Sequence, residues 1–195
     1  MDVLFGAQRA DLGRWETRDF TPGASDGPCP GDHHDAYQRT VATEPAGEPL
    51  PNGPFRRVAA SVLLYEVFPP ELVQAVVRRP AELGDTLGAR HAMGLGLSLF
   101  FASRVVARFD GPAEGRWRTG FTYRTLAGHP TLGEETFAVE KDLASGEVKV
   151  VLGAWSRPGF ALIRLATPLA RRRQRQVNLG ALDRLQALAL TAQPG

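Results

Sequence analysis

The sequence predicts an α+β fold, and two observations carry this prediction. Apolar and polar residues alternate between residues 116 and 155, which indicates consecutive antiparallel strands joined by short loops. After residue 158 the apolar period becomes helical and continues towards the end of the chain. A curved antiparallel sheet wrapped around a long C-terminal helix satisfies this order with only short connections. This arrangement is called a helix grip, and it encloses a cavity between the concave face of the sheet and the helix.

The first part of the chain is rich in residues that interrupt regular structure. Residues 21–54 contain seven Pro and five Gly, and no helical or alternating apolar period is visible there. Each Pro fixes its φ and removes an amide donor, which disfavours helices and central strands. We therefore expect residues 1–54 to form an irregular N-terminal arm that lies against the body, and residues 55–195 to form the helix-grip domain.

The next part of the chain is divided by Pro and Gly into short elements. Residues 58–67 are β-branched and apolar, which predicts a strand buried on both faces. Apolar residues at helical spacing between 72 and 77 predict a short helix that ends before Pro80. Two more strands are expected at 86–93 and 98–109.

Three antiparallel strands follow. Residues 116–126 place aromatic and Thr side chains on one face and mostly Arg on the other, which is typical of a half-buried strand. A second strand begins at Glu134. The segment Asp142 to Gly146 predicts a hairpin turn, because Gly accepts positive φ without steric cost. The third strand covers residues 147–155.

The C-terminal helix is expected to begin near Ser156, a candidate N-cap. The helical period first appears as a stripe of apolar residues at 162, 165, 166 and 169. Thr167-Pro168 then predicts either the cap of a second helical segment or a kink in the first. A further stripe carries the apolar face onward and comprises Val177, Ala181, Leu185 and Leu188.

Composition favours a cytoplasmic protein without a structural metal or disulfide. Cys29 is the single cysteine, so no intramolecular disulfide is possible. Residues 1–20 lack the apolar segment of a signal peptide, and the longest uncharged stretch is far shorter than a membrane span. Charge is unevenly distributed: residues 156–195 hold seven Arg and one acidic residue, a net charge of +6, and the rest of the chain carries −4.

Several motifs resemble one family. They are FTYRTLAGHPTLGEE at 121–135, Phe137-x-Val139-Glu140, and Trp155-Ser156-Arg157-Pro158. In order and spacing they are similar to the family catalogued only as domain of unknown function nineteen-ninety, over about residues 55–190. Arg124 stands where that family has Gly, so we expect its side chain to fill space that a glycine leaves open. The resemblance implies a fold similar to START and birch-pollen-allergen helix-grip proteins, which often bind apolar small molecules, and it implies no activity.

His129, Glu134 and Glu135 are the candidate catalytic residues. A His within reach of a carboxylate can act as a general base, and a hairpin loop can bring all three side chains together. The sequence also allows a purely structural interpretation, because His-Pro and Leu-Gly are turn chemistry and carboxylates beside a turn accept backbone amides.

Five further residues are candidates for ligand binding. Arg124 and Arg157 have the planar donors that hold a carboxylate or phosphate, although Arg157 can equally pair with Glu134 or Glu135. Trp117, Phe121 and Tyr123 line the cavity if their face of the strand points towards the helix. The leading hypothesis is thus a protein that binds an apolar or amphipathic small molecule between sheet and helix, with no cofactor and no metal. The alternative is a hydrolase or isomerase that uses His129 with Glu134 or Glu135.

The run Arg171–Arg175 supports a third hypothesis, an accessory protein that docks a basic helix on an anionic partner. Four Arg within five positions point around more than half of a helix, as a solvated face also would. No base-stacking aromatic residues lie near the run, so no nucleic-acid partner is expected.

Overall fold

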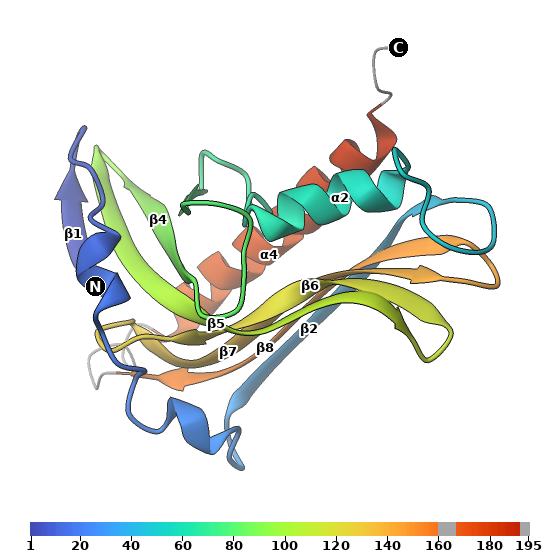
Figure 1. Ribbon diagram of the computed structural model, residues 1–195. Helices are drawn as coiled ribbons and strands as arrows, with labels where there is room; N and C mark the ends of the chain where they lie inside the picture. The colour runs from blue at the N-terminus through green and yellow to red at the C-terminus, as the bar shows by residue number, and fades with distance from the viewer. Residues whose placement is uncertain (160–166, 192–195) are drawn as a thin grey trace.

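The computed structural model describes residues 1–159 and 167–191, which form one curled antiparallel sheet with two helices on its concave side (Figure 1). The strands pair in the order β2-β8-β7-β6-β5-β4-β3, and β1 pairs with β5 outside this path. This architecture confirms the predicted curved antiparallel sheet with a long C-terminal helix against its concave face. The strands are β1 (Asp2–Phe5), β2 (His33–Thr43), β3 (Val73–Val76), β4 (Thr86–Gly94), β5 (Leu97–Ala113), β6 (Arg116–Thr125), β7 (Thr131–Asp142) and β8 (Glu147–Pro158). The helical elements are α1 (Gly13–Glu16), the short 3-10 helix η1 (Ala24–Asp26), α2 (Pro54–Leu63) and α4 (Thr167–Leu190).

The strands expected at 86–93, 98–109, 116–126, 134–140 and 147–155 are confirmed as β4 to β8. The bounds are longer than expected except for β6, which ends one residue earlier. The predicted hairpin between β7 and β8 is also confirmed. The Gly146 amide donates to the Asp142 carbonyl, Gly146 has a φ of +76°, and the Asp142 carboxylate accepts the amides of Ala144 and Ser145.

The strand predicted at 58–67 is wrong, because this segment belongs to helix α2. Pro54 is the first helical residue, and Phe55, Val58, Ala59 and Val62 are all buried. These positions follow the spacing i, i+3, i+4 and i+7, which places them on one helical face against the sheet. The two β-branched Val residues concealed a helical period that begins before residue 58.

The helix predicted between 72 and 77 is also wrong, because residues 73–76 form strand β3 at the edge of the sheet. Val73 packs in the main core beneath the helices, whereas Val76 packs in a second core on the opposite face. Apolar residues that serve two faces of a short strand can imitate a helical stripe. A helix of this length is also marginal without strong tertiary support.

Irregular structure was expected throughout residues 1–54. This prediction is wrong for β1 and α1, and it is wrong for residues 33–43. They form β2, an eleven-residue edge strand paired with β8. The Pro residues responsible for the prediction lie at 22, 28 and 30 and at 45, 49, 51 and 54. They flank the strand and leave its amides intact, so the sheet extends into the segment assigned to the arm.

Ser156 is not the N-cap of the C-terminal helix, because it lies within β8. Helix α4 begins at Thr167, and Pro168 is its second residue. The stripe at 162, 165 and 166 lies outside the described residues, as does the side chain of residue 169. The later stripe is confirmed, because Val177, Ala181 and Leu185 are buried against the sheet and Leu188 packs beside them. Among the helices in the two described ranges, none is both long and apolar enough to cross a membrane.

The main core fills the space between the sheet, α2 and α4. Tyr65, two positions beyond the last residue of α2, lies at its centre and contacts four aromatic rings edge-on, one of them Tyr123 at 5.8 Å between ring centroids. The other three are Phe68, Phe121 and Phe137. The ring centroids are 5.7 Å apart for Phe68, 6.1 Å for Phe121 and 5.5 Å for Phe137. Pairs of this geometry contribute roughly 0.5–1.5 kcal/mol beyond the burial of their surface. The aromatic contacts therefore fix the end of α2 against β6 and β7.

A buried ion pair joins the segment between β2 and α2 to the middle of the sheet. The Lys141 ammonium on β7 lies 2.9 Å from a Glu44 carboxylate oxygen, and both side chains are almost fully buried. Glu44 also accepts the amides of Phe55, in the first turn of α2, and Leu50, while Lys141 donates to the Glu48 carbonyl. Burial by itself raises the pKa of Glu44, but these amide bonds and Lys141 outweigh burial and lower it. The carboxylate is thus held ionised.

Replacing Lys141 with Met is expected to lower the free energy of unfolding by about 3–5 kcal/mol at pH 7, because Glu44 would be left as a buried charge without its counter-ion. Chemical denaturation measures this loss. The matched control is Lys149→Met, which removes a partly exposed lysine paired with Glu147 and should cost at most about 1 kcal/mol. Equal effects of the two substitutions would contradict the role given to the buried pair.

Candidate functional site

The concave face of the sheet carries rows of side chains that the strand register aligns. One row runs across four strands, from Tyr123 on β6 to Glu135 on β7, Ala154 on β8 and Asp35 on β2. Tyr65 reaches the same place from the end of α2, with its hydroxyl 3.4 Å from that of Tyr123. We call Asp35, Tyr65, Tyr123 and Glu135 the interior polar cluster. It lies between the sheet and the N-terminal half of α4.

The size of the side chains changes from row to row. The neighbouring row on one side holds the bulky, fully buried Phe121, Phe137 and Leu152. The row of the polar cluster instead has Ala154 between its two carboxylates. The row beyond it pairs Gly133 with Ser156, and no side chain fits at Gly133 because a Cβ atom there would lie 2.1 Å from the Trp155 carbonyl oxygen. Bulky residues therefore fill one part of the concave face, and small residues leave room at the other.

Glu135 lies in this roomier part, and two observations lead us to infer that it borders a recess. Its carboxylate accepts a hydrogen bond of 2.6 Å from the Tyr123 hydroxyl. Burial is the main reason that the pKa of Glu135 is raised to about 7, with a smaller contribution from the charge of Asp35. Its side chain nevertheless keeps accessible surface and is only half-buried. A group that lies deep in the protein and still has accessible surface borders an internal recess.

Tyr65 is positioned by an unusual backbone conformation. It follows Leu64, the C-cap of α2, and has a φ of +57°, the left-handed region that glycine usually occupies at helix ends. For a residue with a bulky side chain this conformation costs on the order of 1 kcal/mol. The conformation directs the ring into the core and the hydroxyl towards Tyr123. Burial raises the pKa of Tyr65 well above its ordinary value, so the hydroxyl remains a donor.

Asp35 is the second acidic group of the cluster and connects the sheet to α4. Its carboxylate accepts hydrogen bonds from the side-chain amide of Gln174 on α4 at 3.0 Å and from the Tyr37 hydroxyl at 3.2 Å. His33 lies 3.3 Å from the same carboxylate. Asn178, one helical turn beyond Gln174, is buried beside them. The helix thus covers the recess with amide side chains, which can both donate and accept hydrogen bonds.

The structure does not bring His129, Glu134 and Glu135 together. Glu134 and Glu135 are consecutive residues of β7 and point to opposite faces of the sheet. His129 is buried, its Nδ1 atom lies 2.8 Å from the Thr131 carbonyl oxygen, and its ring contacts Phe101 edge-on. Burial lowers the pKa of His129 to about 3, so it is neutral at physiological pH. This geometry favours the structural interpretation of the His-Pro loop.

Arg124 and Arg157 lie on the convex face of the sheet, outside the recess. Arg124 pairs with Glu134 and also donates to the Ser25 hydroxyl. Arg157 pairs with Asp32 at 2.9 Å. The sequence had suggested Glu134 or Glu135 as its partner. Both arginines therefore attach the segment before β2 to the sheet. Arg124 does not fill the recess in place of the family glycine, because its strand position faces the other way.

The three aromatic candidates share the concave face but differ in role. Tyr123 belongs to the polar cluster. Phe121 is completely buried in the main core. Trp117 lies near the hairpin end of β6, where its indole donates to Asp110 at 3.0 Å and the Arg56 guanidinium lies over its ring. Only Tyr123 thus borders the recess through a polar atom.

Sequence reasoning missed Tyr65, Asp35 and Gln174. Tyr65 lay in a segment interpreted as a strand, and Asp35 in one interpreted as an irregular arm. Gln174 was considered only as part of the basic run. In the structure, half-buried and exposed positions alternate along 33–40, and Asp35, Tyr37 and Arg39 are half-buried. Because two of these three side chains are charged, the sequence shows no apolar alternation that would have indicated β2.

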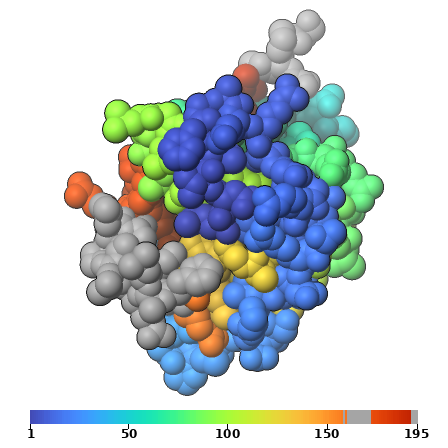
Figure 2. Space-filling model, turned by 90° about the vertical axis from the view of Figure 1, so that its left-hand side faces the viewer, coloured from blue at the N-terminus to red at the C-terminus, as the bar shows by residue number. Residues whose placement is uncertain are grey.

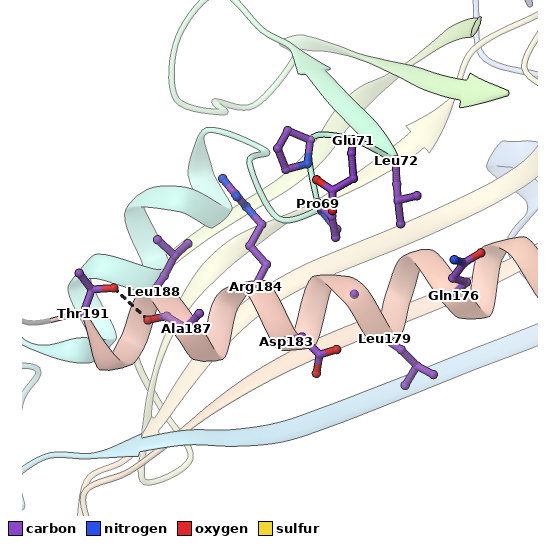
Figure 3. Close-up of a pocket in the computed structure, with 12 residues that line it drawn as sticks. Pro69, Glu71, Leu72, Gln176, Leu179, Asp183, Arg184, Ala187, Leu188 and Thr191 are labelled. Atoms are coloured by element: carbon purple, nitrogen blue, oxygen red, sulfur yellow. Dashed lines mark hydrogen bonds between the residues drawn. The ribbon is translucent and has the colours of Figure 1, made fainter. Parts of the chain in front are cut away.

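A separate groove of about 710 Å³ runs along α4 on the side away from the sheet (Figure 3). Arg184 and Leu188 of α4 face the segment Pro69–Leu72 across it. Gly180 permits this close approach, since a Cβ atom there would lie 2.9 Å from the Pro69 ring. The groove therefore differs in place from the expected cavity between sheet and helix.

Comparisons with known proteins give one curated relative and several similar structures. The chain is 40% identical over 81 residues to a UPF0548 protein of Deinococcus radiodurans, a match that covers 42% of this chain and 38% of that relative's length. Among solved structures, protein CV1439 from Chromobacterium violaceum matches with a TM-score of 0.49 and 16% identity, over 82% of this chain and 98% of that one. Ginseng major latex-like protein 151 from Panax ginseng matches with a TM-score of 0.46 and 10% identity, over 82% and 99%. Ara h 8.0201 matches with a TM-score of 0.45 and 13% identity, over 83% and 100%.

The family comparison covers most of the chain and includes every residue of the interior polar cluster. The matching model spans residues 20–183, from the segment before β2 into the C-terminal part of α4. It therefore begins well before residue 55, where the sequence motifs first suggested the resemblance. The chain belongs to the family described as Domain of unknown function (DUF1990).

Proposed function

We propose that this protein binds an apolar or amphipathic small molecule in the recess between the concave face of the sheet and α4. The observation that supports this proposal is the position of Glu135, a carboxyl that lies deep between sheet and helix and still keeps accessible surface. Binding sites for small molecules are usually concave and mostly apolar, with a few polar groups that orient the ligand. The interior polar cluster has this composition, because the rings of Phe121 and Phe137 pack against Tyr65 and Phe137 also packs against Tyr123.

The polar groups of the cluster indicate how a ligand would be oriented. Glu135 and Asp35 both present carboxylate oxygens, and Ala154 between them leaves room for a ligand atom. A hydroxyl or amine on the ligand can donate a hydrogen bond to either carboxylate. The apolar part of the ligand then extends over Phe121 and Phe137. Because Glu135 has a pKa of about 7, it can accept a hydrogen bond when ionised and donate one when protonated.

Replacing Ala154 with Leu is expected to abolish binding of an apolar probe, because the larger side chain fills the space between Glu135 and Asp35. N-phenyl-1-naphthylamine is a suitable probe, since its fluorescence rises in apolar surroundings and its amine can donate a hydrogen bond. Titration should show binding to the unmodified protein and a loss of at least about tenfold in affinity for Ala154→Leu, equivalent to about 1.4 kcal/mol.

The matched control is Ala36→Leu, which adds the same atoms at an exposed position on the opposite face of β2. It should leave probe binding unchanged. Native mass spectrometry of protein isolated from its own host provides an independent search for a bound compound. Absence of probe binding to the unmodified protein, or equal loss in both variants, would argue against the recess as a ligand site.

The raised pKa of Glu135 also predicts how the free energy of unfolding depends on pH. Because its pKa is higher in the folded protein than the ordinary value of 4.5, folding favours the protonated carboxyl. The resulting stability is complete below about pH 4.5 and is lost as pH rises through about 7. Relative to the unmodified protein, Glu135→Gln should therefore gain about 1–3 kcal/mol of unfolding free energy between pH 5 and pH 8.

Urea denaturation of both proteins at several pH values measures this difference. Glu147→Gln is the control, because Glu147 is exposed and its pKa is shifted downwards by bonds to Lys149 and Thr40. Its substitution should not reproduce the change between pH 5 and pH 8. A constant difference between Glu135→Gln and the unmodified protein across this range would disprove the raised pKa.

A further inference from the structure

The exposed large apolar side chains of the described residues gather at one end of the molecule. There are nine such side chains, and five of them lie here. Three are at the N-terminus and in β1, and two are at the end of β4 and in the turn that leads to β5. Phe5 pairs with Leu97, and the Gly6 amide donates to the Gly96 carbonyl, so the two segments lie side by side. We call this surface the apolar end, and its members are Met1, Val3, Phe5, Met93 and Leu95.

Leu95, at the tip of the hairpin, does not stabilise the fold. Its side chain is fully exposed, and its φ of +51° lies in the left-handed region. Gly94 and Gly96 flank it, so the tip projects without neighbouring side chains. For a leucine this backbone costs on the order of 1 kcal/mol, and the exposed side chain contributes no burial in return. Asn or Gly would suit the position better, which points to a role outside the fold.

Basic side chains of α4 lie next to this tip. Arg173 donates to the Ala92 carbonyl, directly before Met93, at 3.1 Å. Arg172, the preceding residue of α4, is exposed. Figure 2 shows the hairpin tip projecting beside the N-terminal segment, with the start of the described part of α4 close to it.

One further arginine and two acidic residues lie in or beside the N-terminal segment at this end of the molecule. Arg90 donates to the carbonyls of Gly6 and Gln8, at the end of β1. Of the acidic groups in the N-terminal segment, Asp2 accepts the Trp15 indole and Asp11 the Arg14 amide. Both acidic groups are thus engaged in hydrogen bonds within the N-terminal segment.

We propose that the apolar end docks on the surface of a membrane that contains anionic lipids. Leu95 and Met93 would enter the boundary between headgroups and acyl chains, and Arg172 and Arg173 would contact headgroup phosphates. Apolar side chains at a projecting tip with a basic surround fit such a surface, because burial of apolar area and attraction to anionic lipid reinforce each other. This docking is independent of the interior recess and holds whether or not a ligand occupies it.

Co-sedimentation with vesicles tests the proposal. The full chain should bind vesicles of phosphatidylcholine mixed with phosphatidylglycerol at low salt, bind them less at moderate salt, and bind pure phosphatidylcholine weakly. Leu95→Asn should reduce binding about 5- to 30-fold, as expected for the loss of one buried leucine side chain. The double substitution Arg172→Glu and Arg173→Glu should reduce binding to the anionic vesicles at least about tenfold.

Leu83→Asn is the matched control, because Leu83 is 68% exposed and precedes β4, at the opposite end of that strand from the tip. It should leave vesicle binding unchanged. Leu95→Asn should also keep or raise the melting temperature, because Asn tolerates the left-handed conformation, so lost binding cannot be attributed to unfolding. No binding to anionic vesicles at low salt would overturn the proposal. So would equal losses for Leu83→Asn and Leu95→Asn, or self-association that depends on Leu95 without vesicle binding.

Discussion

The pairing of Lys141 with Glu44 is the constraint on which the arrangement of the helices over the sheet depends. Glu44 directly follows β2, accepts the amide of Phe55 in the first turn of α2, and pairs with Lys141 near the end of β7. One carboxylate therefore fixes where the edge strand ends and where the helix begins. The first helical turn also carries unpaired amides that favour an anionic partner. Without this contact the Pro-rich connection between β2 and α2 would have no polar anchor in the core.

The position of α2 in turn determines the candidate site. Because the helix ends at Leu63, Tyr65 enters the core between Phe121 and Phe137 and presents its hydroxyl to Tyr123. Bulky side chains fill the sheet below α2, and small ones lie below the N-terminal half of α4. The same sheet is thus a packed core at one end and a recess with two carboxyls at the other. The raised pKa of Glu135 follows from this placement, since burial is its main cause.

The motif around His129 illustrates why a local pattern can suggest chemistry that the fold does not support. Three chemically suitable residues lie within seven positions, but strand geometry sends Glu134 and Glu135 to opposite faces. Glu134 pairs with Arg124 and so helps to hold the N-terminal segment, whereas Glu135 enters the recess. The turn leaves His129 against Phe101, where burial keeps it neutral. Proximity along the chain therefore did not predict proximity of the functional groups.

The alternation along β6, β7 and β8 and the helical period of the C-terminal residues determined the fold class, because each pattern reports directly which side of an element is buried. The edge elements were beyond such reasoning. Val58 and Val76 are compatible with either a strand or a helix until the rest of the core selects one, and β2 was hidden between flanking prolines. The site needed the tertiary structure for the same reason. Asp35, Tyr65 and Gln174 come from three elements far apart in the chain, and only strand register and helix packing bring them within reach of Glu135.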